Sequence, residues 1–512
     1  MQLGVETTLT ERVAIIDLGS NSARLIVMHI YHNGAYNLVY NQKEAVRLSE
    51  GMSETGVLTH EAMWRAIGTL KIFAHMCELV NVDKILAVAT AAVRNAKNGN
   101  EFLELVHQHT GIPLRAVSGE TEAHLGYTGI INTLDVDNAL LFDLGGASTE
   151  VTLIKDRLPA AVVSLPFGAV NLTERFSTQD KASEVQLAAM REYIISHLER
   201  LPWLRRLYLP IVGVGGTARN IAKIDQKQKN YPFPKVHNYR FGSMAFDEVW
   251  RGLVKTNMAQ RRKYPGLSSE RADIIIAGTT IVKALLEVSQ ATNIIISGCG
   301  VREGMFLEHY LAQQQQPGLI PDILLHSTRN MLLFYKGNEA HAEHVARLAE
   351  TMFDKWHSIL RLTSRDRKLL RVASLLHDIG ITINYYDHAR HSAYLVENAR
   401  LFGLTHREQM LVAVVAGWHN GASAKYVRNK IYSEFLDQHN WQTARKMALL
   451  LALAESLETT QLGLVQDVEP SITGSQAVLK LITDDPVSIE RQAAAQHRKW
   501  FKKELGFDLI IE

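Results

Sequence analysis

Two loops in the sequence repeat one pattern of Asp, Gly and Ser after a buried strand. Asp17-Leu18-Gly19-Ser20 follows the apolar run 14–16, and Asp143-Leu144-Gly145-Gly146 follows the apolar run 140–142. Glycine permits a tight turn in which backbone N–H groups and hydroxyls can point at phosphate oxygens, and the Asp can hold a metal ion or a water. Because a Ser at the same offset and a second apolar strand follow in both copies, the repeat predicts duplicated half-domains that face a phosphate-binding cleft.

Two further glycine-rich turns could bind an anion. Residues 213–217 (Gly-Val-Gly-Gly-Thr) follow an apolar strand and open a helix, and residues 297–304 follow the apolar run 293–296 in the same way. Free N–H groups at a helix start favour an anion. The sequence has no G-x-x-x-x-G-K-[ST] motif, which excludes a P-loop enzyme, and no G-x-S-x-G motif, which weakens a serine-hydrolase interpretation.

The elements that must position these loops alternate between strands and helices up to about residue 313. The periodicity predicts helices over 59–79, 99–108 and 183–198, and strands over 85–89, 114–117 and 209–213, which is typical of α/β layers. Beyond a Gln-, Pro- and Gly-rich linker, helical apolar spacing dominates. We therefore predict two α/β domains over 1–134 and 135–316, a helical domain over 317–470 and a small mixed segment over 471–512.

The length and composition of the chain are those of an ordinary globular protein. The chain has 512 residues, of which 46% are hydrophobic and 21% charged, so it should form several globular domains. Its longest uncharged apolar runs are half a membrane span, and no basic-then-apolar leader is seen, so we expect neither export nor anchoring. The two cysteines lack a C-x-x-C spacing and favour a reduced, cytoplasmic setting. A net charge of +2 is too small to indicate nucleic-acid binding.

Several motifs in order resemble the exopolyphosphatase/guanosine pentaphosphate phosphohydrolase family. They are the Asp17 loop, residues 89–94 (Ala-Thr-Ala-Ala-Val-Arg), Ser118-Gly119-x-x-Glu122-Ala123, the run from Asp143 to Glu150, the 213–217 loop and Arg302-Glu303-Gly304. That family belongs to the actin/sugar-kinase/heat-shock-protein superfamily. The resemblance implies two ribonuclease-H-like domains around a cleft, followed by a helical domain.

The resemblance also implies roles for individual residues. Glu122 would be the catalytic carboxylate that deprotonates the attacking water, and Arg94 would bind the phosphoryl oxygens. Asp143 and Glu150 would hold Mg²⁺ or Mn²⁺. The phosphate would be cradled by Ser20, Asn21, Ser22, Gly145, Gly146, Ser148, Gly215, Gly216 and Thr217. Purely structural roles stay open: Arg94 as a surface charge, Glu150 as a solvated strand residue and Glu122 as a partner of its helix dipole. Ala147 stands where the family usually has a third glycine. Its methyl group fits only if the loop has a negative φ at this residue and no phosphate lies against its Cα atom.

The helical part resembles HD-type phosphohydrolase domains, in which histidines and carboxylates hold a metal between helices. The matching residues are His344, His377, Asp378 and Glu455, with His391 and His419 in sequence order between them. Imidazole and carboxylate ligands suit Mn²⁺, Fe or Zn²⁺. Glu455 replaces the usual Asp, so a fold that keeps these residues without a metal is the alternative.

The resulting functional hypothesis is a Mg²⁺-dependent exopolyphosphatase that also takes guanosine pentaphosphate, acts as a homodimer and has no nucleic-acid or membrane partner. A phosphotransferase of the same superfamily and a catalytically idle nucleotide sensor are the alternatives. A long polymer needs several basic contacts. Arg498, Lys499, Lys502 and Lys503 are therefore expected to line a polyphosphate track, unless they only form a solvated helix face.

Overall fold

The structure of the protein is a computed structural model that describes residues 9–421 and 430–512. It divides into two compact units, here called the α/β unit (residues 9–32 and 36–321) and the helical unit (residues 322–512 with the short segment 33–35). The division falls after Pro321, a few residues beyond the boundary expected from the linker. Within the described residues, no helix has the length and apolar composition required to cross a bilayer.

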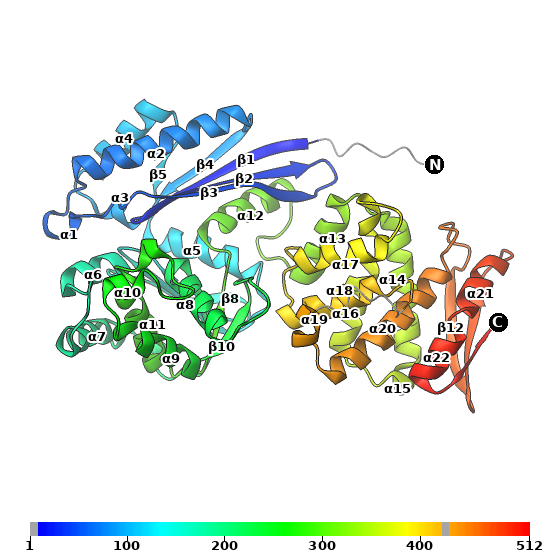
Figure 1. The fold of residues 1–512 in the computed structure, drawn as a ribbon. Helices are drawn as coiled ribbons and strands as arrows, with labels where there is room; N and C mark the ends of the chain where they lie inside the picture. The colour runs from blue at the N-terminus through cyan, green and yellow to red at the C-terminus, as the bar shows by residue number, and fades with distance from the viewer. Residues whose placement is uncertain (1–8, 422–429) are drawn as a thin grey trace. The chain divides into compact units, whose positions relative to one another are not determined.

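The first sheet of the α/β unit has the strand order β3-β2-β1-β4-β5. Its strands are β1 (Leu9–Leu18), β2 (Ser22–Tyr31), β3 (Tyr36–Ala45), β4 (Lys84–Ala89) and β5 (Arg115–Ala116). The first three are antiparallel, and β4 and β5 continue the sheet in parallel with β1. The helices of this part are α1 (Met52–Thr55), α2 (His60–Leu79), α3 (Ala91–Asn95) and α4 (Gly99–Thr110), of which α2 and α4 cover one face (Figure 1).

The second sheet has the order β8-β7-β6-β9-β11-β10. Its strands are β6 (Ala139–Leu144), β7 (Thr149–Lys155), β8 (Leu158–Leu165), β9 (Ile211–Val214), β10 (Tyr239–Gly242) and β11 (Asn293–Ile296). The accompanying helices are α6 (Ala169–Phe176), α7 (Glu184–Leu198), α8 (Gly215–Gln228), α9 (Ser243–Val254), α10 (Met258–Arg261) and α11 (Ile275–Ser289). An apolar core joins this sheet to α6, α7, α8, α9 and α11.

The two sheets are duplicates down to their loop hydrogen bonds. Three antiparallel strands precede two parallel ones in each, and the second sheet adds β10 at its edge. In the first loop the Gly19 N–H donates to the Ser22 carbonyl at 3.0 Å, and in the second the Gly145 N–H donates to the Ser148 carbonyl at 3.0 Å. The prediction of two ribonuclease-H-like domains is confirmed.

Two helices that bring residues to the loops pack side by side. Helix α5 (Gly119–Ile131) begins at the N-cap Ser118, whose hydroxyl accepts a hydrogen bond from the Thr121 N–H, and α12 (Val301–Gln313) follows the 297–300 turn. A Cβ atom on Gly304 of α12 would lie 1.9 Å from the Leu125 carbonyl oxygen of α5. Glycine is therefore required here for the close approach that sets the position of α5.

The helical unit is a bundle built around buried apolar helices. Its helices are α13 (Ile323–Phe334), α14 (Glu339–Lys355), α15 (His357–Leu360), α16 (Ser364–Leu376), α17 (His388–Asn398), α18 (His406–Gly417), α19 (Lys430–Phe435) and α20 (Gln438–Ser456). Asn338, Thr363 and Asp437 cap α14, α16 and α20 through their side chains. The run 447–454 of α20 is buried throughout, which places this helix in the centre of the bundle.

The C-terminal segment packs on this bundle rather than standing apart. A three-stranded sheet of β12 (Asp467–Thr473), β13 (Gln476–Ile482) and β14 (Asp508–Ile511) is accompanied by α21 (Ser488–Ala495) and α22 (Arg498–Leu505). The buried Phe501 ring of α22 contacts the buried Trp356 ring, with centroids 5.1 Å apart. Residues 471–512, which the sequence suggested as a separate segment, thus share one compact unit with the helices.

Candidate active site

A cleft in the α/β unit gathers most of the residues proposed for phosphate binding. It lies where the β1–β2 and β6–β7 loops meet the first turns of α8 and α12, and it encloses about 830 Å³, part of it open to solvent. Its lining includes Ser20, Asn21, Ser22, Glu122, Asp143, Gly145, Gly146, Ser148, Gly215 and Gly216. Of the described α/β-unit residues proposed for the site, Arg94, Glu150 and Thr217 are not in the lining.

Two aspartates occupy matching positions in the cleft at the ends of the duplicated first strands. Asp17 on β1 and Asp143 on β6 both line it. Burial raises the pKa of Asp17, and burial together with the nearby charge of Asp17 raises the pKa of Asp143 to about 6. Neighbouring half-buried carboxylates that repel one another, with oxygen donors only, fit a hard divalent cation such as Mg²⁺.

A group of buried and half-buried arginines lies near these carboxylates. Arg24, Arg219, Arg271 and Arg302 line the cleft. Burial, reinforced by neighbouring arginines, lowers the pKa of Arg24 to about 9 and that of Arg271 to about 10. Within the described part of the chain, the guanidinium groups of Arg24, Arg219 and Arg271 form no hydrogen bond or ion pair. Crowded guanidinium groups without protein partners are suited to binding a multiply charged anion.

Glu122 reaches the cleft from the first turn of α5 and is held by Arg94. The Arg94 Nη1 donates to Glu122 Oε2 at 2.8 Å and to the Val117 carbonyl at 2.9 Å. Burial and the nearby Glu150 raise the pKa of Glu122 well above its usual value, while the Arg94 hydrogen bond opposes this shift. Arg94 therefore contacts the carboxylate in this structure instead of projecting into the cleft.

Glu150 lies opposite Asp143 in the β6–β7 register and is 3% exposed. Its Oε1 accepts a hydrogen bond from the Ser164 hydroxyl at 2.9 Å and lies 4.0 Å from Arg94 Nη2. Burial, with the Asp143 charge as the next cause, raises the pKa of Glu150 to about 7. It is thus a buried member of the carboxylate group, not a solvated strand residue.

The loop hydroxyls point to a missing ligand. Ser20, Ser22 and Ser148 are buried, and the Ser22 Oγ has no hydrogen-bond partner among the described residues. A buried hydroxyl without a partner is unfavourable unless a ligand supplies one. Ala147, the departure from the family loop, has no positive φ, so its methyl group is accommodated without backbone strain.

The first turn of α8 supplies backbone N–H groups. Gly215 has a φ of +93°, and a Cβ there would lie 2.7 Å from the Leu144 carbonyl oxygen. A Cβ on Gly216 would lie 1.9 Å from the Arg271 guanidinium carbon. Thr217, by contrast, is fully buried against Gly278 of α11, so the structure places it in the packing of the second sheet.

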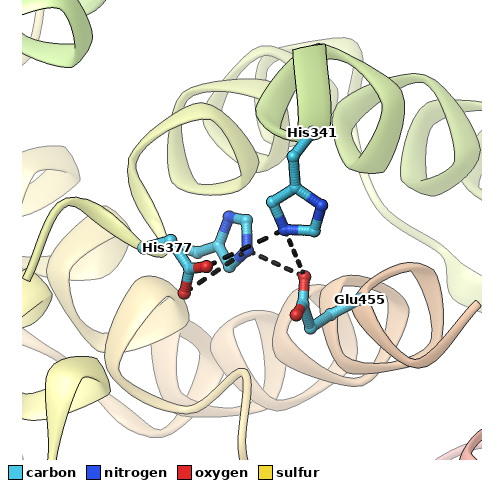
Figure 2. A group of neighbouring side chains, drawn as sticks. His341, His377 and Glu455 are labelled. Carbon is cyan, nitrogen blue, oxygen red and sulfur yellow. Dashed lines mark hydrogen bonds and ion pairs between the residues drawn. The ribbon is translucent and has the colours of Figure 1, made fainter. Parts of the chain in front are cut away.

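In the helical unit one predicted ligand position needs correction. His344 was expected beside His377, Asp378 and Glu455, but the residue that joins this group is His341, one helical turn earlier on α14 (Figure 2). The His344 Nε2 instead lies 2.9 Å from the Val465 carbonyl and 3.6 Å from Glu458. The two histidines share an apolar-flanked helix, and the sequence pattern alone does not distinguish which turn faces the bundle interior.

Of the two further histidines in the predicted order, His419 joins a cluster of possible ligands among the described residues and His391 does not. His388 at the start of α17 and His419 just after α18 lie with Asp378, whereas His391 is not part of either cluster of the described residues. Although burial favours the neutral ring, Asp378 and Glu455 raise the pKa of His377 to about 9. Burial lowers the pKa of His419 to about 4.

The basic run of the C-terminal segment is exposed on α22. Arg498, Lys499 and Lys503 form no ion pair with any described residue, while the Lys502 Nζ lies 2.7 Å from Asp508 Oδ1. The structure therefore leaves most of this charge available to solvent.

Three arginines of the cleft were not among the residues singled out from the sequence. Arg24 lies two residues after Ser22 on the same strand face, and Arg219 lies one turn after Gly215, so periodicity could have indicated both. Arg271 comes from a short turn far from every glycine-rich loop, and only tertiary packing brings it to the cleft.

Comparison with known proteins agrees with this arrangement. Residues 26–313 match the Ppx/GppA phosphatase family, and residues 324–492 match Ppx/GppA phosphatase, domain III. A solved Ppx/GppA family member from Aquifex aeolicus is 30% identical over 59% of this chain and 98% of its own, with a TM-score of 0.52. An exopolyphosphatase from Cytophaga hutchinsonii shares the fold at 23% identity, covering 60% of this chain and 99% of its own with a TM-score of 0.56. The chain belongs to the Ppx/GppA phosphatase family.

Proposed function

We propose that this protein is an exopolyphosphatase that releases terminal orthophosphate from linear inorganic polyphosphate, and that guanosine pentaphosphate is hydrolysed at the same site. The observation that carries the proposal is the cleft in which unpartnered arginines, an unpartnered Ser22 hydroxyl and the Glu122 carboxylate converge. Both substrates end in a phosphoanhydride, which presents dense negative charge and a reactive terminal phosphorus atom.

Binding would use the groups that lack protein partners. Arg24, Arg219 and Arg271 would donate charge-assisted hydrogen bonds to phosphate oxygens. The Ser22 hydroxyl and the N–H groups at the start of α8 would complete the cradle around the terminal phosphate. These donors would also stabilise the charge that spreads over the phosphoryl oxygens during transfer.

Glu122 would act as general base. A water placed between its carboxylate and the terminal phosphorus loses a proton to Glu122 as its oxygen attacks, and the bridging oxygen leaves with the shortened chain. The raised pKa of Glu122 matches the task, because a carboxylate with a higher pKa accepts a proton more readily. Arg94 is a positioning residue, since it holds the Glu122 oxygen and does not itself line the cleft.

Asp143 would hold a divalent metal ion, with Asp17 beside it and Glu150 in support. Such an ion, Mg²⁺ or Mn²⁺, would neutralise charge on the phosphate oxygens when bound. Burial and, after it, repulsion between neighbouring carboxylates raise the pKa values of Asp143 and Glu150, and a bound cation would stabilise the ionised forms.

The test is to measure initial rates of phosphate release from purified long polyphosphate, tripolyphosphate and guanosine pentaphosphate, each with and without Mg²⁺. The proposal expects metal-dependent release that is fastest on long polyphosphate and strongly reduced in Glu122→Gln. ADP-dependent formation of ATP would instead identify a phosphotransferase. Nucleotide binding without phosphate release from any substrate would identify a sensor.

A further inference from the structure

Arg271 comes to the phosphate cleft from a turn that also carries negative charge. It ends the short helical turn η2 (Ser269–Arg271), and Glu270 and Asp273 stand on either side of it in the sequence. Arg271 is 9% exposed and lines the cleft, where its guanidinium group forms no hydrogen bond or ion pair with a described residue. Burial is the main cause that lowers the pKa of Arg271, whereas the charges of Glu270 and Asp273 raise it. Both carboxylates therefore act on this guanidinium group, and a carboxylate that does so competes with a phosphate anion for it.

These two carboxylates are paired with cations from the other α/β domain. The Lys43 ammonium group contacts Glu270 Oε2, and the Arg47 Nη2 lies 3.4 Å from Asp273 Oδ2. The hydrogen bond from Lys43, followed by its charge, lowers the pKa of Glu270. Lys43 is part of the first sheet, whereas the turn that carries Arg271 packs with the second sheet. Neither Lys43 nor Arg47 lines the cleft.

The strand that supplies these cations also contacts a second arginine of the cleft. Lys43 lies on β3, opposite Arg24 in the β2–β3 register, and Arg47 comes two residues after the end of β3. Asn41, two residues before Lys43 and on the same face of the strand, accepts a hydrogen bond at 3.2 Å from Arg302 Nη1. The edge strand of the first sheet thus meets the second domain at both of its buried cleft arginines.

The two ion pairs are too exposed to contribute much to folding stability. The side chains of Lys43 and Glu270 are 37% and 54% exposed, and those of Arg47 and Asp273 are 47% and 21% exposed. Their effect on Arg271 is of another kind, because this guanidinium group is buried and charges interact more strongly there than in water. The pairing therefore matters more for an anion held by Arg271 than for the fold.

We infer that Lys43 and Arg47 are positioning residues for phosphate binding. By pairing with Glu270 and Asp273, they leave the Arg271 guanidinium group available to the substrate. The inference rests on the proposed function, in which Arg271 donates hydrogen bonds to phosphate oxygens. Because the cations and the carboxylates belong to different domains, this part of the anion site is complete only where the two domains meet.

The test measures the affinity of the full-length chain for inorganic tripolyphosphate by isothermal titration calorimetry, with a chelator present to prevent metal-dependent hydrolysis. Lys43→Gln combined with Arg47→Gln leaves both carboxylates unpaired, and Kd should rise about 3- to 30-fold. Adding Glu270→Gln and Asp273→Asn to that protein removes the competing charge, and Kd should return close to the wild-type value. The conservative pair Lys43→Arg and Arg47→Lys should leave Kd unchanged.

A double-mutant cycle determines whether the effect passes through Arg271. Arg271→Gln should itself weaken binding, and removing Lys43 and Arg47 from that protein should have little further effect, because the group for which the carboxylates compete is gone. Lys71→Gln combined with Lys84→Gln is the matched control. Both lysines are exposed on the same domain and their removal changes the net charge equally, so Kd should stay unchanged. Circular dichroism verifies the fold of each variant.

The inference would be overturned by an unchanged Kd in the Lys43→Gln and Arg47→Gln protein, or by an equal loss on the Arg271→Gln background. A quadruple variant that stays as weak as the double variant would also overturn it, since the ion pairs would then only hold the two domains together. Phosphate release from long polyphosphate is measured in parallel with Mg²⁺. The expected pattern of tripolyphosphate binding without any phosphate release would contradict the proposed hydrolysis and support this inference, whereas no binding by the wild-type chain would contradict both.

Discussion

At the scale of single residues, the Glu122–Arg94 pair is the centre of the proposed chemistry. The carboxylate lines the cleft, and the guanidinium holds it from behind at 2.8 Å. Burial makes Glu122 a stronger base than a solvated glutamate, and Arg94 limits that effect so that the carboxylate stays ionised over a wider pH range. Removing either group should therefore have a distinct kinetic consequence.

Glu122→Gln keeps the size and hydrogen bonding of the side chain but removes the base. Turnover of polyphosphate should fall by about 10²–10⁴, while binding of the substrate is retained. Rate and affinity are measured together on the same preparation. Glu120→Gln is the matched control, because Glu120 is an exposed neighbour in the same helical turn. Near-normal turnover in Glu122→Gln would remove this residue from the catalytic role.

Arg94→Gln should change the pH profile. A base must be deprotonated to act. Because the pKa of Glu122 lies above its usual 4.5, activity should begin to fall at a pH higher than 4.5 when the solution is made more acidic. Without the Arg94 charge the pKa rises further, and the acid limb of kcat should move upward by about 1 to 3 pH units. Lys97→Gln, which removes an exposed charge three residues away, should leave the limb in place. An unmoved limb in Arg94→Gln would contradict the positioning role.

At the scale of elements, the β1–β2 and β6–β7 hairpins have the same backbone arrangement but carry different charged residues. In the β1–β2 register Arg24 lies opposite Asp17, and in the β6–β7 register Glu150 lies opposite Asp143. Residues directly opposite on antiparallel strands share a face of the sheet. One copy therefore places a carboxylate and a guanidinium in the cleft lining, whereas the other places Asp143 in the lining with the buried Glu150 beside it, which separates anion binding from cation binding.

The first turn of α8 is the element most sensitive to a small change. Gly215→Ala puts a methyl group 2.7 Å from the Leu144 carbonyl at a φ of +93°, a conformation that costs about 1 to 3 kcal/mol for a residue with a side chain. The free energy of unfolding should fall by at least this amount, and KM for polyphosphate should rise because the N–H groups of the turn move. Chemical denaturation and steady-state kinetics measure the two effects.

Gly68→Ala is the control for that substitution. Gly68 is in the middle of α2, and an added Cβ there would meet no atom within 4 Å. Alanine should stabilise this position by about 0.5 to 1 kcal/mol without altering KM. A Gly215→Ala protein that behaved like Gly68→Ala would show that the turn does not contact the substrate.

At the scale of the whole molecule, two basic runs of the sequence, residues 261–263 and residues 498–503, lie in different environments. Arg261 is fully buried and donates hydrogen bonds to the Ala272 and Gln179 carbonyls, so it stabilises the packing around α10. The run on α22 is exposed, and only Lys502 among its described members is paired with an acidic residue. Of the two runs, the one on α22 is therefore the one whose charges are accessible to a polyanion.

Replacing Arg498, Lys499, Lys502 and Lys503 with Ala should raise KM for long polyphosphate and flatten its dependence on salt. Each phosphate contact releases condensed counterions, so fewer contacts give a shallower slope of log KM against log salt concentration. Tripolyphosphate is too short to use a remote track, and its kinetics should be unchanged. Equal losses on both substrates would indicate a folding defect or a contact near the cleft, and no loss on either would return the run to a solvated helix face.

The sequence by itself determined the duplicated strands, the glycine-rich turns and the helical remainder, because these depend on local periodicity and backbone freedom. Helix α2 begins one residue after its predicted start because the Thr59 side chain caps it. Strand β12 was not among the predicted strands. Its Pro470, which has no N–H to donate, is tolerated because β12 is at the edge of its sheet. Ser20, Asn21, Ser22, Gly145 and Gly146 were placed in the cleft by motif, and they line it.

Tertiary structure decided which side chains meet across the chain. Arg271 lines the cleft, Arg94 hydrogen-bonds Glu122, and Thr217 is buried in the packing of the second sheet. A local sequence pattern predicts none of these contacts. The choice of His341 over His344 depends on which turn of α14 faces the neighbouring helices. Long-range packing sets burial and the distance between charges, and these two quantities set the pKa values of the cleft residues.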